Sequence, residues 1–242
     1  MLQISNLSKR YGRFTALSDV SFSIRPGEVL GLIGPNGSGK TTLFECLGGV
    51  LPADRGTVFA AGRALSPAER SETMFYLPDG IAPWPSQTVR WALDFIVGFF
   101  GARPICKGSD PLGVDRVINE LDLAPLVDAP IGTLSKGQRK RALLAIGLLT
   151  PQPILLADEP FDGLDLRQSR DVARTLRAHA TAGRTMLLSI HQIADAARVC
   201  DRFVLLSGGR VRGEGTLDDL SDVARSRGVP AADLEEIFLA LT

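Results

Sequence analysis

The segment from Gly34 to Thr41 has the residue types and the spacing of a phosphate-binding loop. It reads GPNGSGKT, which fits the pattern GxxxxGK followed by Ser or Thr. Its glycines let main-chain N–H groups turn inward around an anion, because no Cβ stands in the way. Lys40 would reach the β- and γ-phosphates of a nucleotide, and the Thr41 hydroxyl would ligate Mg²⁺. The predicted phosphate-binding residues are Gly34, Pro35, Asn36, Gly37, Ser38, Gly39, Lys40, Thr41 and Thr42.

A chance glycine-rich turn is the alternative interpretation of this segment. Such a turn would match the pattern in about one chain per hundred of this length, so phosphate binding is favoured. The flanks also agree, because the loop stands between an apolar run and a helical pattern.

An acidic pair, Asp158 and Glu159, directly follows the apolar run 154–157. In open α/β sheets ligands bind at the carboxyl ends of strands, so Asp158 is placed to hold Mg²⁺ and Glu159 to polarise an attacking water. Alone, such a pair is more often a helix cap or a surface turn. Beside a phosphate loop, the catalytic interpretation is favoured.

Two further segments are candidates for contact with phosphate. Ser135 is a plausible N-cap of a helix, and a helix N-terminus that carries Ser and Gly is also an anion site. His191 follows the apolar run 186–190, and at the end of a strand it could contact a γ-phosphate.

The surrounding pattern predicts the elements that position these residues. The continuous apolar runs 29–33, 154–157, 186–190 and 203–206 are typical of strands covered on both faces, and helical patterns between them favour a parallel sheet. Residues 85–147 are rich in helical patterns. The fold class is therefore α/β, with a helical insertion in its middle.

Two local patterns complete this prediction. Val20, Phe22 and Ile24 alternate with serines, as in a half-buried antiparallel strand. After the phosphate loop, a helix is expected whose apolar positions are Leu43, Cys46, Leu47, Val50 and Leu51.

Composition excludes several classes of protein. The 242 residues carry 27 Lys and Arg against 27 Asp and Glu, so the formal net charge is zero, which argues against nucleic acid as a partner. The first residues lack the apolar core of a signal peptide, and we expect a cytosolic chain. Cys46, Cys106 and Cys200 form neither a disulfide framework nor a zinc motif.

Taken in order, the motifs resemble those of the ATP-binding subunit of an ABC transporter, from Leu2 to about Thr216. The signature is the specific element, because other ATPases with a phosphate loop lack it. The matching motifs are Walker A (Gly34–Thr41), the ABC signature (Leu134–Gln138), Walker B (Leu155–Glu159) and the D-loop (Gly163–Asp165).

The resemblance implies a P-loop ATPase core with a mainly parallel sheet, an N-terminal antiparallel β subdomain and an inserted α-helical subdomain. The expected boundaries are 1–84 and 148–216 for the core, 85–147 for the helical subdomain and 217–242 for a C-terminal helical extension.

The resemblance also implies ATP as substrate, Mg²⁺ as cofactor, Glu159 and His191 as catalytic residues, and Tyr11 stacked on adenine. In this family the signature of one subunit closes on the ATP held by another. A single signature per chain thus implies a second ATP-binding subunit, identical or related. A separate transmembrane permease is implied too, with this chain peripheral on the cytoplasmic face of the membrane. The signature residues are Ser135, Lys136, Gly137 and Gln138, and the D-loop residue is Asp165.

Two residues depart from the family pattern. Lys136 stands where glycine is usual, a feature often found in exporter-type cassettes. Asp79 stands where the family has the Q-loop glutamine, so either an acid replaces that glutamine or Pro78–Gly80 is only a turn.

The sequence favours an exporter, and two rival functions remain as alternatives. The segment 234–242 is similar to the closing helix of export cassettes, although a helix that merely caps the core explains it equally well. One rival is a soluble ABC protein that acts on ribosomes or DNA, and another is a small-molecule kinase. Neither fits well, since the chain lacks a second cassette and a kinase does not explain Leu134–Gln138.

Overall fold

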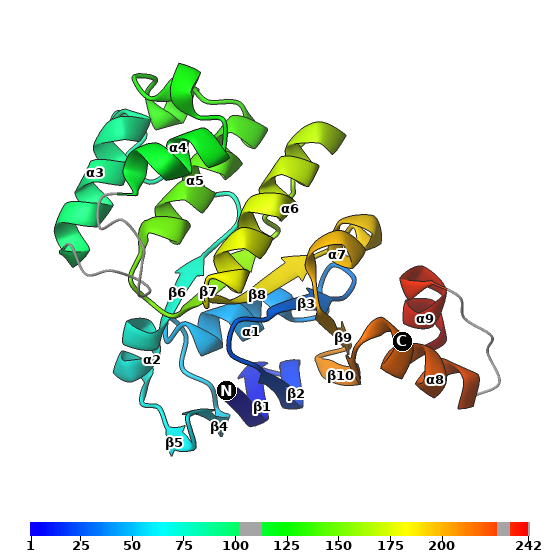
Figure 1. The fold of residues 1–242 in the computed structure, drawn as a ribbon. Coiled ribbons are helices and arrows are strands. Elements are labelled where there is room, and N and C mark those ends of the chain that lie inside the picture. Colours follow the sequence, from blue (N-terminus) through cyan, green and yellow to red (C-terminus); the bar gives the residue numbers. More distant parts are fainter. Residues whose placement is uncertain (102–112, 227–232, 242) are drawn as a thin grey trace.

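Two β-sheets of different construction form the base of the molecule (Figure 1). The computed structural model describes residues 1–101, 113–226 and 233–241. The first sheet is antiparallel, in the order β2-β1-β4-β5, with strands β1 (Leu2–Tyr11), β2 (Phe14–Ile24), β4 (Arg55–Ala60) and β5 (Arg63–Ala64). The second has the order β10-β9-β3-β8-β7-β6 and comprises β3 (Val29–Ile33), β6 (Met74–Leu77), β7 (Ile154–Asp158), β8 (Thr185–Ile190), β9 (Arg202–Ser207) and β10 (Arg210–Gly215).

The second sheet is parallel except for β10, which pairs antiparallel with β9. All residues of β3, β7 and β8 are buried, as their continuous apolar runs predict. The predicted fold class is therefore confirmed: a P-loop ATPase core with a mainly parallel sheet, an N-terminal antiparallel sheet and an inserted group of helices.

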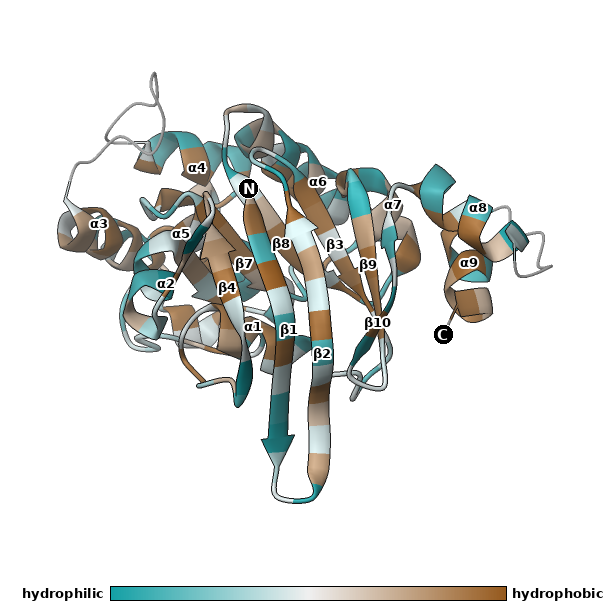
Figure 2. Ribbon diagram, turned by 90° about the horizontal axis from the view of Figure 1, so that it is seen from below, coloured by the Kyte–Doolittle hydropathy of each residue, from teal (hydrophilic) through white to brown (hydrophobic). Residues whose placement is uncertain are grey.

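The antiparallel sheet follows from the alternation in β2. Val20, Phe22 and Ile24 are buried while the serines between them are more exposed, and Leu2 of β1 lies opposite Ile24. Figure 2 shows this alternation as brown and paler bands along the β1–β2 hairpin. The buried side chains join both sheets and the first helix in one apolar cluster.

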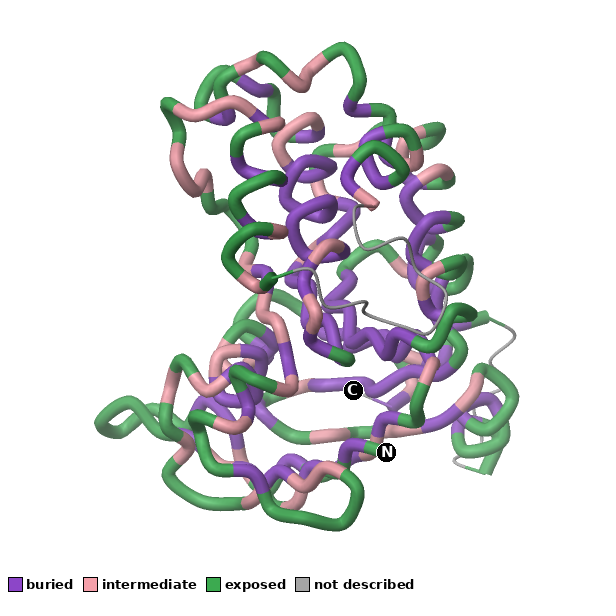
Figure 3. Tube along the Cα trace, turned by 60° about the vertical axis from the view of Figure 1, so that its left-hand side comes forward, coloured by how far each residue is buried: buried purple, intermediate pink, exposed green. Residues whose placement is uncertain are grey.

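Helices cover the parallel sheet and extend beyond one end of it (Figure 1). Those of the inserted region, α3 to α5, lie together, and α5 contacts α3, α4, β6 and β7. Figure 3 shows that buried segments concentrate where the helices meet one another and the sheets. The helices are α1 (Lys40–Leu47), α2 (Pro67–Thr73), α3 (Val89–Phe100), α4 (Val114–Glu120), α5 (Lys136–Leu149), α6 (Leu166–Thr181), α7 (Ile193–Val199), α8 (Leu217–Ser226) and α9 (Leu234–Leu241).

The predicted extent of α1 is wrong at its C-terminal end. The helix stops at Leu47, and the following Gly48 is its C-cap. Gly49 has φ +76°, a left-handed conformation that glycine adopts without strain and that ends the helix. Val50 is consequently 68% exposed and does not continue the apolar face.

Across the described ranges, none of the helices has the length and apolar character that a membrane span requires. Cys46 and Cys200 are buried free thiols, whereas Cys106 lies outside the described residues.

Truncation at the centre of β7 should destabilise the fold strongly. Leu156 is fully buried in the cluster that joins both sheets, so Leu156→Ala should lower the free energy of unfolding by about 2–5 kcal/mol. Urea unfolding followed by circular dichroism measures this change. The control is Leu239→Ala, at a leucine that is 72% exposed, and a loss of similar size in both variants would contradict the assignment.

Candidate functional site

The phosphate loop connects β3 to α1, and its lysine is held across it. Lys40 Nζ donates to the carbonyl oxygens of Gly34 at 2.8 Å and Pro35 at 3.4 Å. Gly39 has φ +106°, and a Cβ there would come within 2.6 Å of the Ala16 carbonyl oxygen. Only glycine fits this position, because a side chain would clash with Ala16 and the left-handed backbone would be strained.

The buried hydroxyl of Ser38 shows that this loop suits an anion. Ser38 is 2% exposed, and its Oγ has no hydrogen-bond partner among the described residues. An unsatisfied buried hydroxyl is unusual in a folded protein. A phosphate oxygen bound in the loop is an acceptor of the kind that this hydroxyl lacks.

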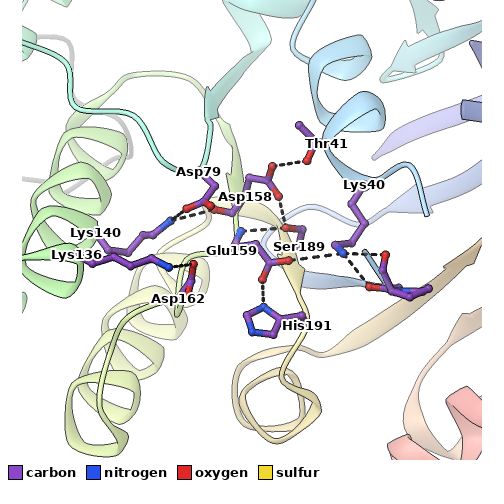
Figure 4. A network of polar contacts seen from close by, with 12 residues as sticks. Lys40, Thr41, Asp79, Lys136, Lys140, Asp158, Glu159, Asp162, Ser189 and His191 are labelled. Atoms are coloured by element: carbon purple, nitrogen blue, oxygen red, sulfur yellow. Dashed lines mark hydrogen bonds and ion pairs between the residues drawn. The ribbon is translucent and has the colours of Figure 1, made fainter. Parts of the chain in front are cut away.

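Asp158, the last residue of β7, accepts two hydrogen bonds from neighbouring elements (Figure 4). Thr41 Oγ1 donates to its Oδ2 at 2.9 Å, and Ser189 Oγ donates to its Oδ1. The carboxylate and the Thr41 hydroxyl are hard oxygen ligands, which fit Mg²⁺. In the described parts of the chain there is no cluster of three or more His, Cys, Asp or Glu side chains that could hold a metal ion.

Glu159 lies between the lysine and the histidine that the sequence singled out. Its Oε1 is 3.7 Å from Lys40 Nζ, and its Oε2 is 2.5 Å from His191 Nδ1. Its main-chain N–H donates to Ser189 Oγ at 3.0 Å. Glu159 has φ +50°, a left-handed conformation that is strained for a residue with a Cβ and that is often found at functional sites.

Two adjoining cavities lie beside these groups, and Asn36, Asp79 and Glu159 line both of them. The first is also lined by His191 and by Phe238 of α9. The second contains Lys40, Thr41, Asp158 and the aromatic residues Tyr11 and Phe14.

The aromatic end of the second cavity suits a planar base. Tyr11 is 47% exposed and Phe14 is 63% exposed, so their ring faces are available for stacking. Lys9 Nζ lies 5.8 Å from the centre of the Tyr11 ring. The sequence pointed to Tyr11 but missed Phe14, which it could have found from the hairpin that pairs these two residues.

The signature segment lies at the exposed N-terminus of α5. Ser135 Oγ accepts a hydrogen bond from the Gln138 N–H at 3.3 Å, and Gln138 Oε1 accepts one from the Ser135 N–H at 2.9 Å. This capping box confirms the expected N-cap. In the described part of the chain, residues 135–138 line neither cavity. The structure does not bring the signature onto its own phosphate loop.

The signature packs closely on the D-loop of the same chain. A Cβ on Gly137 would lie 2.5 Å from the Gly163 carbonyl oxygen, so only glycine allows this contact. Asp165 caps α6, because its Oδ1 accepts from the Gln168 N–H at 2.8 Å. Lys136 reaches the same region and forms an ion pair with Asp162 at 2.5 Å.

Asp79 occupies a turn and also forms an ion pair with a buried lysine. Gly80 has φ +70°, as expected for a turn, and Asp79 Oδ1 accepts from Lys140 Nζ at 2.6 Å. Sequence reasoning missed Lys140 and the role of Ser189. The spacing of Lys136 and Lys140, four residues apart on one helix face, was the available signal.

The chain matches known proteins over most of its length. A family model described as ABC transporter matches residues 17–162, more than half of the chain. The chain belongs to the ABC transporter family. Members pair as dimers and act with transmembrane permeases, and their ATP-binding subunits are ATPases. This ABC subunit is accordingly a nucleotide-binding ATPase.

The relatives include both importers and exporters. The chain is 37% identical to the hemin import ATP-binding protein HmuV of Thermobifida fusca, over 89% of this chain and 76% of that protein. It is 31% identical to the lipopolysaccharide export system ATP-binding protein LptB of Acidithiobacillus ferridurans, over 98% of this chain and 99% of that one. A solved ATP-binding subunit of an ABC transporter superposes with a TM-score of 0.85 at 29% identity, over 100% of this chain and 99% of that chain.

Removal of the phosphate-loop lysine should weaken nucleotide binding strongly. Lys40→Ala is expected to raise the Kd for ATP by about 100-fold, because hydrogen bonds to charged groups contribute up to about 3 kcal/mol. Titration with a fluorescent ATP analogue measures this change. The control is Arg225→Ala on the exposed face of α8, and equal affinity in both variants would contradict the phosphate-loop assignment.

Proposed function

We propose that two such subunits, identical or related, close head to tail on two ATP molecules and thereby drive a transmembrane exporter. The observation that carries this proposal is the separation of the two halves of the site. The phosphate loop, Asp158, Glu159 and His191 surround the cavities, whereas the signature lies outside them on an exposed helix tip. A second copy supplies the missing half.

The signature of the second subunit provides hydrogen-bond donors to the γ-phosphate oxygens that the phosphate loop does not contact. Ser135 Oγ already accepts from Gln138, so its hydroxyl proton is left to donate to a γ-phosphate oxygen. The first N–H groups of α5 and the helix dipole act in the same direction. Donors that close on the γ-phosphate stabilise the charge that develops there during transfer.

Hydrolysis then uses the residues around the cavities. Glu159 accepts a proton from water as the water oxygen bonds to the γ-phosphorus and the bond to the bridging oxygen of ADP breaks. His191, bonded to Glu159, steadies the γ-phosphate, and Tyr11 stacks on adenine. Thr41 and Asp158 would hold Mg²⁺, which neutralises phosphate charge when it is bound.

Loss of the γ-phosphate removes the link between the subunits and the dimer opens. The movement passes through the helical subdomain, residues 85–147, which is set between the two core segments 1–84 and 148–216. The C-terminal helical extension comprises residues 217–242. The core stays fixed on the nucleotide while the helical subdomain transmits the change.

An exposed aromatic face on α3 is the proposed contact with the permease. Trp91, Phe95 and Phe99 follow one another at helical spacing, and Phe99 is 70% exposed. The rings of Trp91 and Phe95 are stacked with centres 5.0 Å apart, and Trp84 packs edge-on against both. An exposed apolar patch of this kind is typical of a protein interface. The loop that begins at Asp79 joins it to the catalytic site.

Export is favoured by the C-terminal helices and by the match over nearly the full length of an export ATPase. The chain then lies on the cytoplasmic face of the membrane, bound through its permease. Nucleic acid is not a partner in this proposal.

Mixing two inactive variants tests the shared site. Lys40→Ala destroys the phosphate loop of one subunit, and Ser135→Arg destroys the signature of the other. Their mixed dimer retains one site in which both halves are intact, so ATPase activity should return to at most about half that of the wild type. Phosphate release measures this activity.

The matched control for this mixture pairs Lys40→Ala with Glu159→Gln. Both residues belong to the same half of the site, so no intact site forms and activity should stay absent. If Lys40→Ala and Ser135→Arg also fail to restore activity, the signature does not act on the partner's ATP, and the proposal is wrong.

Inside-out membrane vesicles that contain the permease test coupling and direction. ATP added outside should load the vesicles with the compound that stimulates the ATPase, and Phe99→Asp should reduce uptake about tenfold because a charge is placed in an apolar interface. Leu239→Asp, at an exposed leucine of α9, is the control. ATP-driven release from preloaded vesicles would contradict export, and unchanged uptake in Phe99→Asp would contradict docking at α3.

A further inference from the structure

The carboxylate of Asp79 is the partner of a buried cation. Lys140, in the second turn of α5, donates from Nζ to Asp79 Oδ1 at 2.6 Å, and the same ammonium lies 3.4 Å from the carbonyl oxygen of Asp158. The side chain of Lys140 is 5% exposed and that of Asp79 is 38% exposed. A buried ammonium without a counter-charge is strongly unfavourable, so the structure depends on Asp79 to neutralise Lys140.

The pair joins the signature helix to the catalytic side of the molecule (Figure 4). Asp79 lines both cavities, while Lys140 belongs to the helix that begins after Ser135. One turn nearer the helix tip, Lys136 binds Asp162 and holds the pKa of that carboxyl below its usual range. Two lysines on one face of α5 thus bind two acids at the rim of the first cavity.

The pair also accounts for the departure at the Q-loop position. A glutamine there, as in the family pattern, would leave the charge of Lys140 without a counter-ion. The carboxylate of Asp79 supplies that counter-charge, so the acid adds little net charge to the cavity.

We propose that Lys140 is a positioning residue of the ATPase: through Asp79 and the Asp158 carbonyl, it sets the helix tip that carries Ser135 relative to the catalytic residues of its own subunit. The inference rests on the ATPase activity of the proposed function. In the contacts of the described residues, neither member of the pair touches Lys40. Asp79 lines both cavities, so the pair is expected to act on turnover and closure more than on the hold of Lys40 on the nucleotide.

A double-mutant cycle of Asp79→Asn and Lys140→Met tests this inference. Asp79→Asn leaves the buried Lys140 ammonium without a counter-charge, and Lys140→Met leaves the partly exposed Asp79 carboxylate without its partner. In each single variant kcat should therefore fall about tenfold, while the double variant should recover to within about threefold of the wild type. The KM for ATP should change less than about twofold in every variant. The control cycle, Asp222→Asn with Arg225→Met, removes an exposed ion pair of α8 and should show no coupling.

A second readout follows closure of the dimer. In a Glu159→Gln background, Asp79→Asn should raise the ATP concentration needed for dimerisation about tenfold, and the added Lys140→Met should reverse most of that increase. Gel filtration at increasing ATP concentration measures the change. If Lys140→Met fails to fold, Lys140→Gln replaces it, since its amide can still donate to the Asp158 carbonyl.

Several outcomes would overturn the inference. One is that the losses of kcat in the two single variants multiply in the double variant. Another is a rise in KM at unchanged kcat, and a third is lowered thermal stability with unchanged turnover and closure. Failure of the mixing experiment with Lys40→Ala and Ser135→Arg would instead reject the shared site. It would leave this cycle intact, because both contacts of Lys140 lie within one chain.

Discussion

The carboxylate of Asp158 holds together the ends of three neighbouring strands. It accepts from Thr41, which follows β3, and from Ser189 of β8, while Asp158 itself ends β7. Since β8 lies between β3 and β7, these two hydrogen bonds fix the edge of the sheet at which ligands bind. Ser189 also accepts from the Glu159 N–H, and the strained main chain of Glu159 then turns its carboxylate toward Lys40.

Local chemistry explains which parts of the fold the sequence predicted well. The buried strands, the N-cap at Ser135 and the phosphate loop depend on residues close together in the chain, so their patterns are visible without the structure. The end of α1 was missed because a helical spacing was extended across Gly48 and Gly49, which terminate helices. The pair of Asp79 and Lys140 was missed because these residues are 61 positions apart and meet only when α5 packs beside β6.

The candidate site was predictable in its parts but not in its arrangement. Each motif indicates the chemistry of its own residues, but the sequence does not show which motifs line the same cavity. The position of the signature outside both cavities depends on how α5 is held against the D-loop, through the contact of Gly137 with Gly163. Transport direction is less accessible still, because the relatives that match the chain include both an import and an export ATP-binding protein.

The aromatic face of α3 leaves the free chain prone to self-association. Trp91, Phe95 and Phe99 present adjoining rings to solvent, and water is released when two such faces meet. The zero formal net charge provides little electrostatic repulsion to keep the copies apart. Production of this chain alone at high concentration therefore favours aggregation through the α3 face.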